Sequence, residues 1–348
     1  MDASPAPDVR ALVERALFAF LEERRRLLPD AEDLVAELER VARAGGKRLR
    51  PAFCVWGYRS GGGTDDEAIA RAAASLELLH TFAIIHDDVM DRSPMRRGTP
   101  ATYRQLAEGH RTMRGDADRF GVSAAILAGD LALALAGELW WTAGFPRDAL
   151  VDAVAIYHAM RAEVIGGQYL DLLAAARGDA TPEETRRISV LKSGRYTVER
   201  PLLIGAALAA APDDVRRALA AFGAPLGEAF QLHDDIIGAF GDPTTTGKDA
   251  DSDLREGKQT LLVALAKKAA TPAQRSVLDT LLGSTHLDAQ GAEQLRAVLR
   301  DTGALDEVRE TIAGLLAEAR AALAAGPISG DAARALRVLA DEVDAGAL

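Results

Sequence analysis

The stretch HTFAIIHDDVMD, residues 80–91, joins an apolar helix to a cluster of carboxylates. Its pattern predicts a long helix that starts near residue 65 and ends near Asp91. At about 100° per residue, His80, Asp87 and Asp91 project within about 20° of one direction. Carboxylates that end an apolar face are costly unless a cation binds there, and hard oxygen ligands suit Mg²⁺ shared with phosphate. A solvated acidic helix end is the alternative that this motif alone leaves open.

The composition and periodicity of the whole sequence predict an all-α fold. Of its 348 residues 48% are hydrophobic but only 5% aromatic, which suits close-packed helices better than a β-sandwich. Helical periodicity continues from about residue 10, with breaks at Gly and Pro and neither a long linker nor a repeat. We therefore predict a loose tail over residues 1–9 and a single domain over residues 10–348.

Composition excludes several classes of protein. A net charge of −11 argues against a nucleic-acid-binding protein. The lone Cys54, in an apolar stretch, excludes an intramolecular disulfide framework and fits a buried thiol in a reducing cytosol. The most apolar stretch, residues 122–141, contains Asp130 and Glu138 and is expected to form a buried helix, not a membrane span. Residues 1–30 show no signal peptide, so a cytoplasmic protein is expected.

Further motifs place acidic and basic groups together. FQLHDDI at residues 230–236 contains a second pair of adjacent aspartates. Two motifs with a Gly-Lys pair follow, GDPTTTGK at 241–248 and GKQT at 257–260. Glycine beside lysine lets backbone and charge approach a phosphate closely. GGKRLRP at residues 45–51 puts cations at a helix N-terminus, where an anion would be favoured. The pair Arg96-Arg97 forms either a salt-bridge patch with the aspartates or a diphosphate clamp, and Lys192-Ser193 adds a basic site within an apolar helix.

Together with GGQYLDL and LKSGRYT, these motifs resemble the trans-isoprenyl diphosphate synthase (polyprenyl synthetase) family in identity and in order. The resemblance spans roughly residues 45 to 260 and implies an isoprenoid-synthase-type helical bundle around a deep central cavity. It also implies a homodimer, isopentenyl diphosphate and an allylic diphosphate as substrates, and three Mg²⁺ ions held by two facing Asp-rich helices.

The resemblance assigns roles to individual residues. Metal ions would be held by Asp87, Asp91 and Asp234, with Asp88 and Asp235 close by or in support. The allylic diphosphate would contact Arg96, Lys192, Ser193, Gln231, Lys248 and Lys258. Isopentenyl diphosphate would contact Lys47, Arg50, His80 and Arg97, and Gln168 and Asp171 would line the same cavity.

These assignments imply a mechanism without a protein nucleophile. The metals and cations, with Asp87, Asp88, Asp91, Arg96, Lys192, Asp234 and Lys248 as the catalytic set, would stabilise the departing diphosphate. The resulting carbocation is attacked by the double bond of isopentenyl diphosphate, and a proton then leaves. We interpret His80 as a diphosphate donor rather than a base, and His86 and His233 as packing or supporting residues.

Two positions depart from the family pattern. The second acidic motif has Gly238 where its last Asp is expected, a loss for which Asp242 or water could compensate. The usual Lys-Thr pair is Lys192-Ser193, which keeps the hydroxyl.

Product length depends on side chains about one turn before Asp87, namely Phe82 and Ala83. In the family that the chain resembles, an aromatic residue at the fifth upstream position, with no two-residue insertion in the first motif, implies a short product, so we predict geranylgeranyl diphosphate, with farnesyl diphosphate as runner-up. The alternative is that Phe82 simply packs against a neighbouring helix. Two other functions stay open: a class I terpene cyclase, whose second metal triad is not found in this sequence, and a non-catalytic partner subunit.

Overall fold

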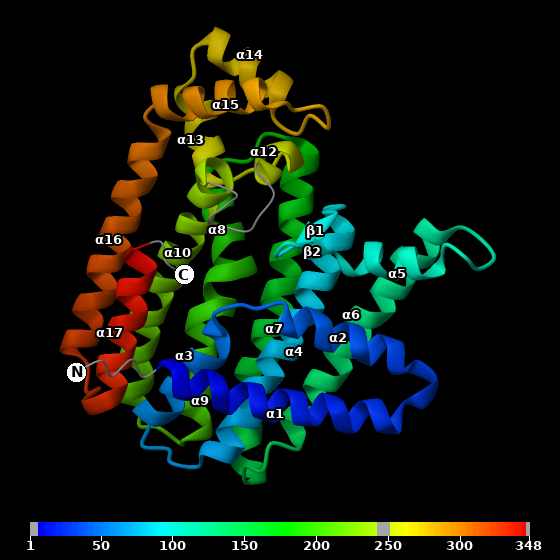
Figure 1. Ribbon diagram of the computed structural model, residues 1–348. Helices are drawn as coiled ribbons and strands as arrows, with labels where there is room; N and C mark the ends of the chain where they lie inside the picture. The colour runs from blue at the N-terminus through cyan, green and yellow to red at the C-terminus, as the bar shows by residue number, and fades with distance from the viewer. Residues whose placement is uncertain (1–5, 242–250, 346–348) are drawn as a thin grey trace. The chain divides into compact units, whose positions relative to one another are not determined.

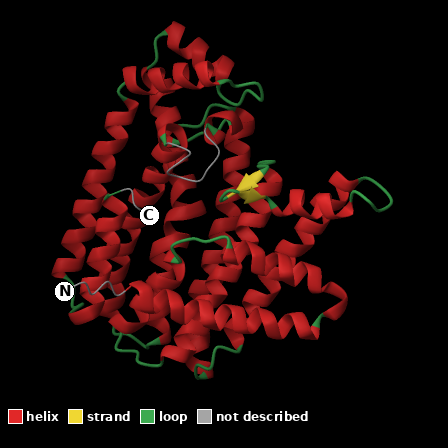
Figure 2. Ribbon diagram, viewed as in Figure 1, coloured by secondary structure: helices red, strands yellow, loops and turns green. Residues whose placement is uncertain are grey.

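The structure is a computed structural model that describes residues 6–241 and 251–345 (Figure 1). Helices make up nearly all of these ranges, which confirms the all-α prediction (Figure 2). The backbone divides into two compact units. The first contains the described residues up to Asp152 with Gly205–Ala210, and the second contains Ala153–Ile204 with the described residues from Ala211 onward. A single domain over residues 10–348 stays a prediction.

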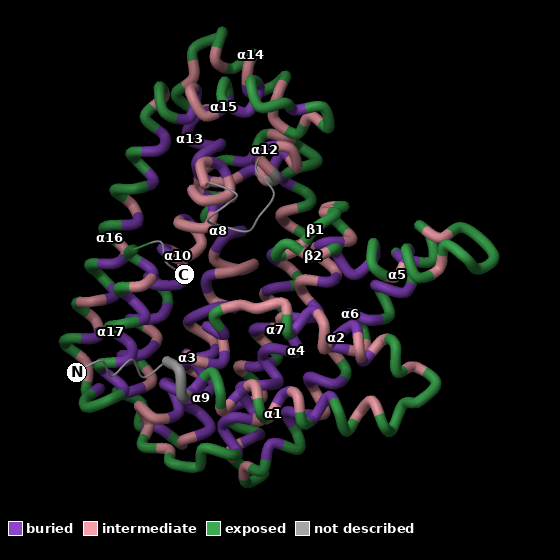
Figure 3. The backbone as a smooth tube through the Cα atoms, in the orientation of Figure 1, coloured by how far each residue is buried: buried purple, intermediate pink, exposed green. Residues whose placement is uncertain are grey.

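The first unit is built around one long central helix. Its elements are α1 (Ala6–Leu27), η1 (Pro29–Ala31), α2 (Glu32–Arg43), α3 (Leu49–Ser60), α4 (Asp66–Met90), β1 (Met95–Arg96), β2 (Thr99–Pro100), α5 (Thr102–His110) and α6 (Ala117–Trp141). Helix α4 packs against α1, α2, α3, α5 and α6. Because it is apolar around most of its circumference, α4 is the core of the unit (Figure 3).

The bounds of α4 agree with the sequence prediction. Asp65 caps its N-terminus by accepting a hydrogen bond from the Ala68 amide at 3.0 Å. The helix ends at Met90, with Asp91 as its C-cap, whose amide donates to the Asp87 carbonyl at 2.8 Å. The acidic cluster therefore lies at the C-terminal end of the central helix of the unit.

A short hairpin follows α4 and was not predicted. Strands β1 and β2 pair antiparallel, with Met95 opposite Pro100 and Arg96 opposite Thr99. Arg97 and Gly98 both have positive φ angles, 51° and 73°, as in a two-residue type I′ turn. Strands of two residues are too short to produce a recognisable alternation in the sequence.

The N-terminus also differs from expectation, because α1 begins at Ala6 and so includes residues assigned to a loose tail. Alanine and a first-turn proline are both compatible with a helix start.

Helix α6 covers the predicted segment 122–141 but is not buried as expected. Exposed fractions are 44% for Ile126, 58% for Leu127 and 51% for Trp141. By length and composition α4 and α6 could each cross a membrane, but 78% of the apolar window of α4 is buried against 39% for α6. The prediction of a buried helix is wrong for the outer face of α6, because hydropathy alone does not distinguish a helix face in the core from an exposed apolar face.

The second unit holds most of the remaining helices. They are α7 (Arg147–Arg177), which begins in the first unit, α8 (Pro182–Ser189), η2 (Val190–Glu199), α9 (Arg200–Leu208), which ends in the first unit, α10 (Asp213–Phe240), α12 (Ser252–Glu256), α13 (Leu261–Ala269), α14 (Pro272–Leu281), α15 (Ala289–Asp301), α16 (Ala304–Ala325) and α17 (Gly330–Asp344). Thr181 and Thr271 form capping boxes at the starts of α8 and α14, and a proline follows each threonine in the first turn. Within this unit, α10 packs against α16, η2 and α17.

Candidate active site

The acidic end of α4 is joined to the hairpin by an ion pair. Asp88 is buried, and Arg96 donates from Nε to its Oδ1 at 2.8 Å, with a second bond from Nη2. The same guanidinium lies 3.5 Å from Asp87 Oδ2. Arg96 is therefore held beside the predicted metal ligands, and Asp88 contacts the Arg96 guanidinium directly.

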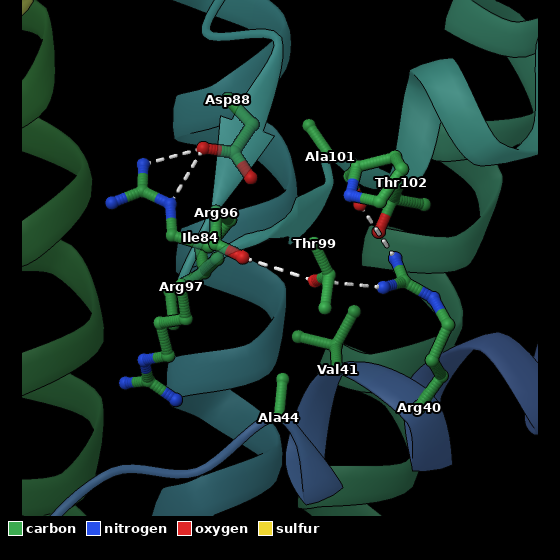
Figure 4. Close-up of a pocket in the computed structure, with 11 residues that line it drawn as sticks. Arg40, Val41, Ala44, Ile84, Asp88, Arg96, Arg97, Thr99, Ala101 and Thr102 are labelled. Atoms are coloured by element: carbon green, nitrogen blue, oxygen red, sulfur yellow. Dashed lines mark hydrogen bonds and ion pairs between the residues drawn. The ribbon is translucent and has the colours of Figure 1, made fainter. Parts of the chain in front are cut away.

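Asp88 and Arg96 also line a small pocket, and hydrogen bonds around this pocket orient the hairpin (Figure 4). Arg40 of α2 donates to Thr99 Oγ1 at 3.2 Å and to the Pro100 carbonyl at 3.1 Å, while the Thr99 hydroxyl donates to the Arg96 carbonyl at 3.0 Å. The pocket is lined by Arg40, Val41, Ala44, Ile84, Asp88, Arg96, Arg97, Thr99, Pro100, Ala101 and Thr102. Sequence reasoning missed Arg40, which resembles an ordinary helix partner of Glu37 three residues earlier.

Arg97 of the hairpin contacts the loop before α3, in which the basic motif at residues 45–51 begins. Arg97 donates to the Gly45 carbonyl, and a Cβ added at Gly46 would lie 3.0 Å from the Arg97 guanidinium. Gly46 has a φ of 133°, which other residues rarely adopt, so the backbone conformation favours glycine there. Arg48, within the same motif, is buried and binds Glu77 at 2.6 Å and Glu14 at 3.1 Å. Arg48 therefore supports the fold, whereas the exposed Lys47 and half-buried Arg50 beside it stay candidates for substrate contact.

His80 shows that positive charge is concentrated here. Burial lowers its pKa well below the usual range, and the charges of Arg50, Arg97, Arg96 and Arg48 lower it further. Burial and these positive charges together favour the neutral imidazole, and a bound anion would reduce the repulsion among the cations. Of the four residues predicted for isopentenyl diphosphate, the structure groups Arg50, His80 and Arg97, with Lys47 on the adjoining loop.

The second acidic cluster lies near the end of α10, in the second unit. Asp235 is buried and accepts a hydrogen bond from Gln231 Nε2 at 2.7 Å. Burial raises the pKa of Asp235 to about 7; the Gln231 hydrogen bond opposes this rise, whereas the charges of Asp234 and Asp253 add to it. A divalent cation beside Asp235 would restore its ionised form.

The space left by Gly238 is filled by a carboxylate from another helix. A Cβ added at Gly238 would lie 1.8 Å from Asp253 Oδ2, and Asp253 Oδ1 accepts from Lys258 Nζ at 2.8 Å. Asp253 of α12 therefore occupies the side-chain position that the motif leaves empty. Asp242, which we considered as a substitute, and Lys248 lie outside the described residues.

Lys192 and Ser193 lie in η2, a π-helical segment that the sequence did not reveal. Lys192 Nζ donates to Asp171 Oδ2 of α7 at 2.7 Å. A Cβ added at Gly167 would lie 2.5 Å from the Lys192 amide nitrogen, so α7 and η2 approach closely at the predicted cavity motif. Gln168 Nε2 is buried and has no hydrogen-bond partner among the described residues. Wide helical turns occur frequently at functional sites.

The donor set fits a hard divalent cation. Within residues 6–241 and 251–345, no three His, Cys, Asp or Glu side chains converge as a complete metal site. Mg²⁺ is usually held by one or two carboxylates, with water and substrate phosphate completing its octahedron. Aspartates beside arginine and lysine therefore match metal ions shared with a diphosphate better than a metal cage made by protein alone.

Phe82 is 8% exposed and packs edge-to-face on His86, whose ring centroid lies 4.8 Å away; Ala83 is half-buried. His86 is thus a packing residue, as the sequence predicted. The contact is compatible with both interpretations of Phe82, as a floor and as a packing residue.

Known proteins were compared with the chain at the levels of sequence and structure. Residues 32–299 match the family described as polyprenyl synthetase. A geranylfarnesyl diphosphate synthase of Aeropyrum pernix is 35% identical over 273 residues, covering 76% of this chain and 79% of that protein. A (2E,6E)-farnesyl diphosphate synthase of Mycobacterium tuberculosis is 36% identical over 255 residues, covering 73% of this chain and 66% of that protein.

Among solved structures, a geranylgeranyl pyrophosphate synthase of Corynebacterium glutamicum, complexed with isoprenyl diphosphate and magnesium, matches with a TM-score of 0.93. It is 35% identical and the match covers 99% of each chain. A polyprenyl synthase of Caulobacter crescentus, complexed with calcium and isoprenyl diphosphate, matches at 29% identity and a TM-score of 0.81, over 97% of this chain and 94% of that one. With its all-α fold and its ordered acidic and basic motifs, the chain belongs to the polyprenyl synthetase family and is a trans-prenyltransferase that makes prenyl diphosphates.

Proposed function

We propose that the enzyme condenses isopentenyl diphosphate with an allylic diphosphate in a Mg²⁺-dependent reaction whose main product is geranylgeranyl diphosphate. The observation that carries this proposal is the arrangement at the end of α4. There Arg96 contacts Asp87 and Asp88, and the positive charges of four arginines act on His80 of the same helix. A prenyl transfer driven by ionisation requires carboxylates that bind metal ions and, beside them, basic side chains that bind diphosphates.

We assign Asp87, Asp91 and Asp234 as the metal ligands, with Asp88 and Asp235 in support. When bound, the Mg²⁺ ions, three by family resemblance, supply Lewis-acid stabilisation of the diphosphate. Asp88 orients Arg96 through its hydrogen bonds, and Gln231 orients Asp235.

Three of the cations predicted for the allylic diphosphate, all among the described residues, are already positioned by carboxylates. Lys192 is held by Asp171 and Lys258 by Asp253, as Arg96 is by Asp88. Charged groups that are oriented before the substrate binds need little reorganisation during the reaction. We assign these three cations, with Ser193, Gln231 and Lys248, to the allylic diphosphate.

The chemistry then follows from charge. The allylic C–O bond breaks with its electron pair going to the departing diphosphate, whose negative charge Arg96, Lys192 and Lys258 stabilise. The double bond of isopentenyl diphosphate forms the new C–C bond, and the proton lost afterwards passes to the released diphosphate. Neutral His80 donates a ring N–H to the diphosphate of isopentenyl diphosphate, alongside Lys47, Arg50 and Arg97.

We propose farnesyl diphosphate as the second candidate product. The relatives that match the chain include synthases named for geranylgeranyl, geranylfarnesyl and farnesyl diphosphate. The aromatic side chain of Phe82, one turn before Asp87, favours geranylgeranyl diphosphate as the longest main product.

We also propose that the enzyme is a cytoplasmic homodimer in which a second copy covers α6. Ile126, Leu127 and Trp141 expose apolar side chains on this helix, and the small, exposed Ala134 lies between Leu127 and Trp141. The acidic Asp130 on the same face disfavours a lipid contact.

The decisive experiment supplies purified protein and Mg²⁺ with isopentenyl diphosphate and, in turn, dimethylallyl, geranyl and farnesyl diphosphate. We expect geranylgeranyl diphosphate as the main product by mass spectrometry, and activity to be lost with a chelator. Asp87→Asn and Asp234→Asn should each lower kcat by at least about 100-fold, while Asp306→Asn, an exposed aspartate on α16, leaves it unchanged.

The same assay separates the alternatives. A hydrocarbon formed from geranylgeranyl diphosphate alone would identify a terpene cyclase. Absence of turnover by the chain on its own would indicate a non-catalytic partner subunit and contradict the proposal.

A further inference from the structure

Phe82 does not stand alone on α4, because a histidine from the next turn supports it. His86 lies four residues later, so both side chains project from the same face of the helix. Their rings meet edge-to-face with centroids 4.8 Å apart and an interplanar angle of 67°. In this geometry the phenyl ring cannot turn toward His86, because the imidazole occupies that space.

His86 is in turn held by α6. Its Nε2 lies 3.0 Å from the carbonyl oxygen of Ile126. Since a carbonyl can only accept, the hydrogen is on Nε2. Asp130 Oδ1 lies 3.8 Å from the same nitrogen. The imidazole is therefore oriented by the backbone of α6 and also contacts the Phe82 ring.

Gly129 provides the room for this arrangement. A Cβ added there would lie 2.2 Å from His86 Nε2 and 2.3 Å from Cδ2, far inside contact distance. The imidazole thus occupies the position where the side chain of residue 129 would otherwise be. Gly129 is buried within α6, where glycine is unfavourable for a helix relative to alanine, so its presence follows from this close approach.

We infer that His86 and Gly129 determine product length by fixing the position of the Phe82 ring. His86 acts as a positioning residue and not as a base or a substrate ligand. This inference rests on the proposed function, because it assigns a length-determining role to the Phe82 ring of a prenyl-chain-lengthening enzyme. It adds α6 to the elements that control length, beyond the residues upstream of the acidic motif.

The test is a pair of substitutions with opposite expected effects on the product. His86→Ala vacates the space over Gly129, so Phe82 can turn into it and the main product should lengthen by at least one isoprene unit. Gly129→Ala expels the imidazole from α6 toward Phe82, so the main product should shorten. In the double variant His86→Ala/Gly129→Ala the added methyl meets no imidazole, and the products should match those of His86→Ala.

Matched controls separate positioning from general damage. Gly314→Ala, on α16, adds a methyl group that meets no atom within 4 Å and should leave the products unchanged. The KM for isopentenyl diphosphate and the Mg²⁺ dependence should stay within about twofold of the parent in His86→Ala, since a damaged diphosphate site would alter them. If Gly129→Ala does not fold, His86→Ala still decides the question.

The possible failures are distinguishable. A parent protein that makes no prenyl diphosphate would overturn the proposed function and, with it, this inference. An active parent whose product distribution is identical in His86→Ala and Gly129→Ala would overturn the inference alone.

Discussion

The carboxylate of Asp253 occupies the space in which a side chain at Gly238 would lie, with its Oδ2 only 1.8 Å from the position of the missing Cβ. Asp253 is also bonded to Lys258 and raises the pKa of Asp235, so it is electrostatically part of the second acidic cluster. The last carboxylate of that motif has thus been replaced by one from a different helix.

Gly238→Ala should therefore weaken Mg²⁺ binding by displacing Asp253 rather than by disturbing α10. Since the carboxylate is the end of a flexible side chain, the protein should stay folded. We expect the Mg²⁺ concentration for half-maximal activity to rise about tenfold, as is typical when a supporting group at a metal site is lost. The shift in melting temperature caused by Mg²⁺ with an unreactive allylic diphosphate analogue should shrink in parallel.

A swap of the two side chains is the control for this prediction. Gly238→Asp/Asp253→Gly returns a carboxylate to the same space from α10 and should recover most of the Mg²⁺ response. An unaltered response in Gly238→Ala would show that Asp253 has no part in metal binding.

Phe82→Leu and Phe82→Ala should lengthen the products made from isopentenyl diphosphate, with the larger change in the alanine variant. The ring is 8% exposed, so its removal opens space beside α4 and costs stability, by about 3–5 kcal/mol for alanine. Chain length is measured by mass spectrometry after incubation with each primer. Phe222→Leu, at a fully buried position in the second unit, is the control for loss of stability. Equal products from parent and both Phe82 variants would leave Phe82 as a packing residue only.

Glu163→Gln should destabilise the second unit at neutral pH. Arg200 binds Glu163 at 2.6 and 2.9 Å and Arg195 at 3.1 Å, which ties α7 to η2 and α9. Burial raises the pKa of Glu163, but the bonds and charges of these arginines outweigh it and hold the pKa below 4.5. We expect the free energy of unfolding to fall by about 1–2 kcal/mol at pH 7, measured by urea denaturation.

The pH dependence of this loss has a definite sign. A carboxyl whose pKa is lowered in the folded state contributes stability above its unfolded pKa and loses it as pH falls through the folded value. The difference between Glu163→Gln and the parent should therefore narrow as pH falls below 4.5. A difference that grows in acid would contradict the ion-pair explanation. Glu293→Gln, at an exposed pair, should unfold like the parent.

Leu127→Glu should convert the proposed dimer into a monomer. Leu127 is 58% exposed on α6, and a carboxylate buried between two copies without a partner would be strongly unfavourable. The molar mass from light scattering after gel filtration gives the answer. Val338→Glu, at a 38% exposed position on α17, is the matched control and should not alter the mass. A Leu127→Glu protein that keeps the parent's dimeric mass would exclude α6 as the interface.

The sequence by itself determined the helical fold, the bounds of α4 and the family, because these depend on local signals: apolar periodicity, caps such as Asp65, and motifs read in order. It also located Asp87, Asp88, Asp91 and Arg96, since they lie within ten residues of one another along the chain.

Only the tertiary structure decided which distant side chain fills which space. That Asp253 replaces the missing carboxylate at Gly238, and that Gly129 makes room for His86 behind Phe82, depends on the approach of separate helices. The π-helical form of η2 and the exposed face of α6 were likewise hidden, because the same residues satisfy an ordinary helical period. Packing between elements far apart in the chain leaves no local pattern in the sequence.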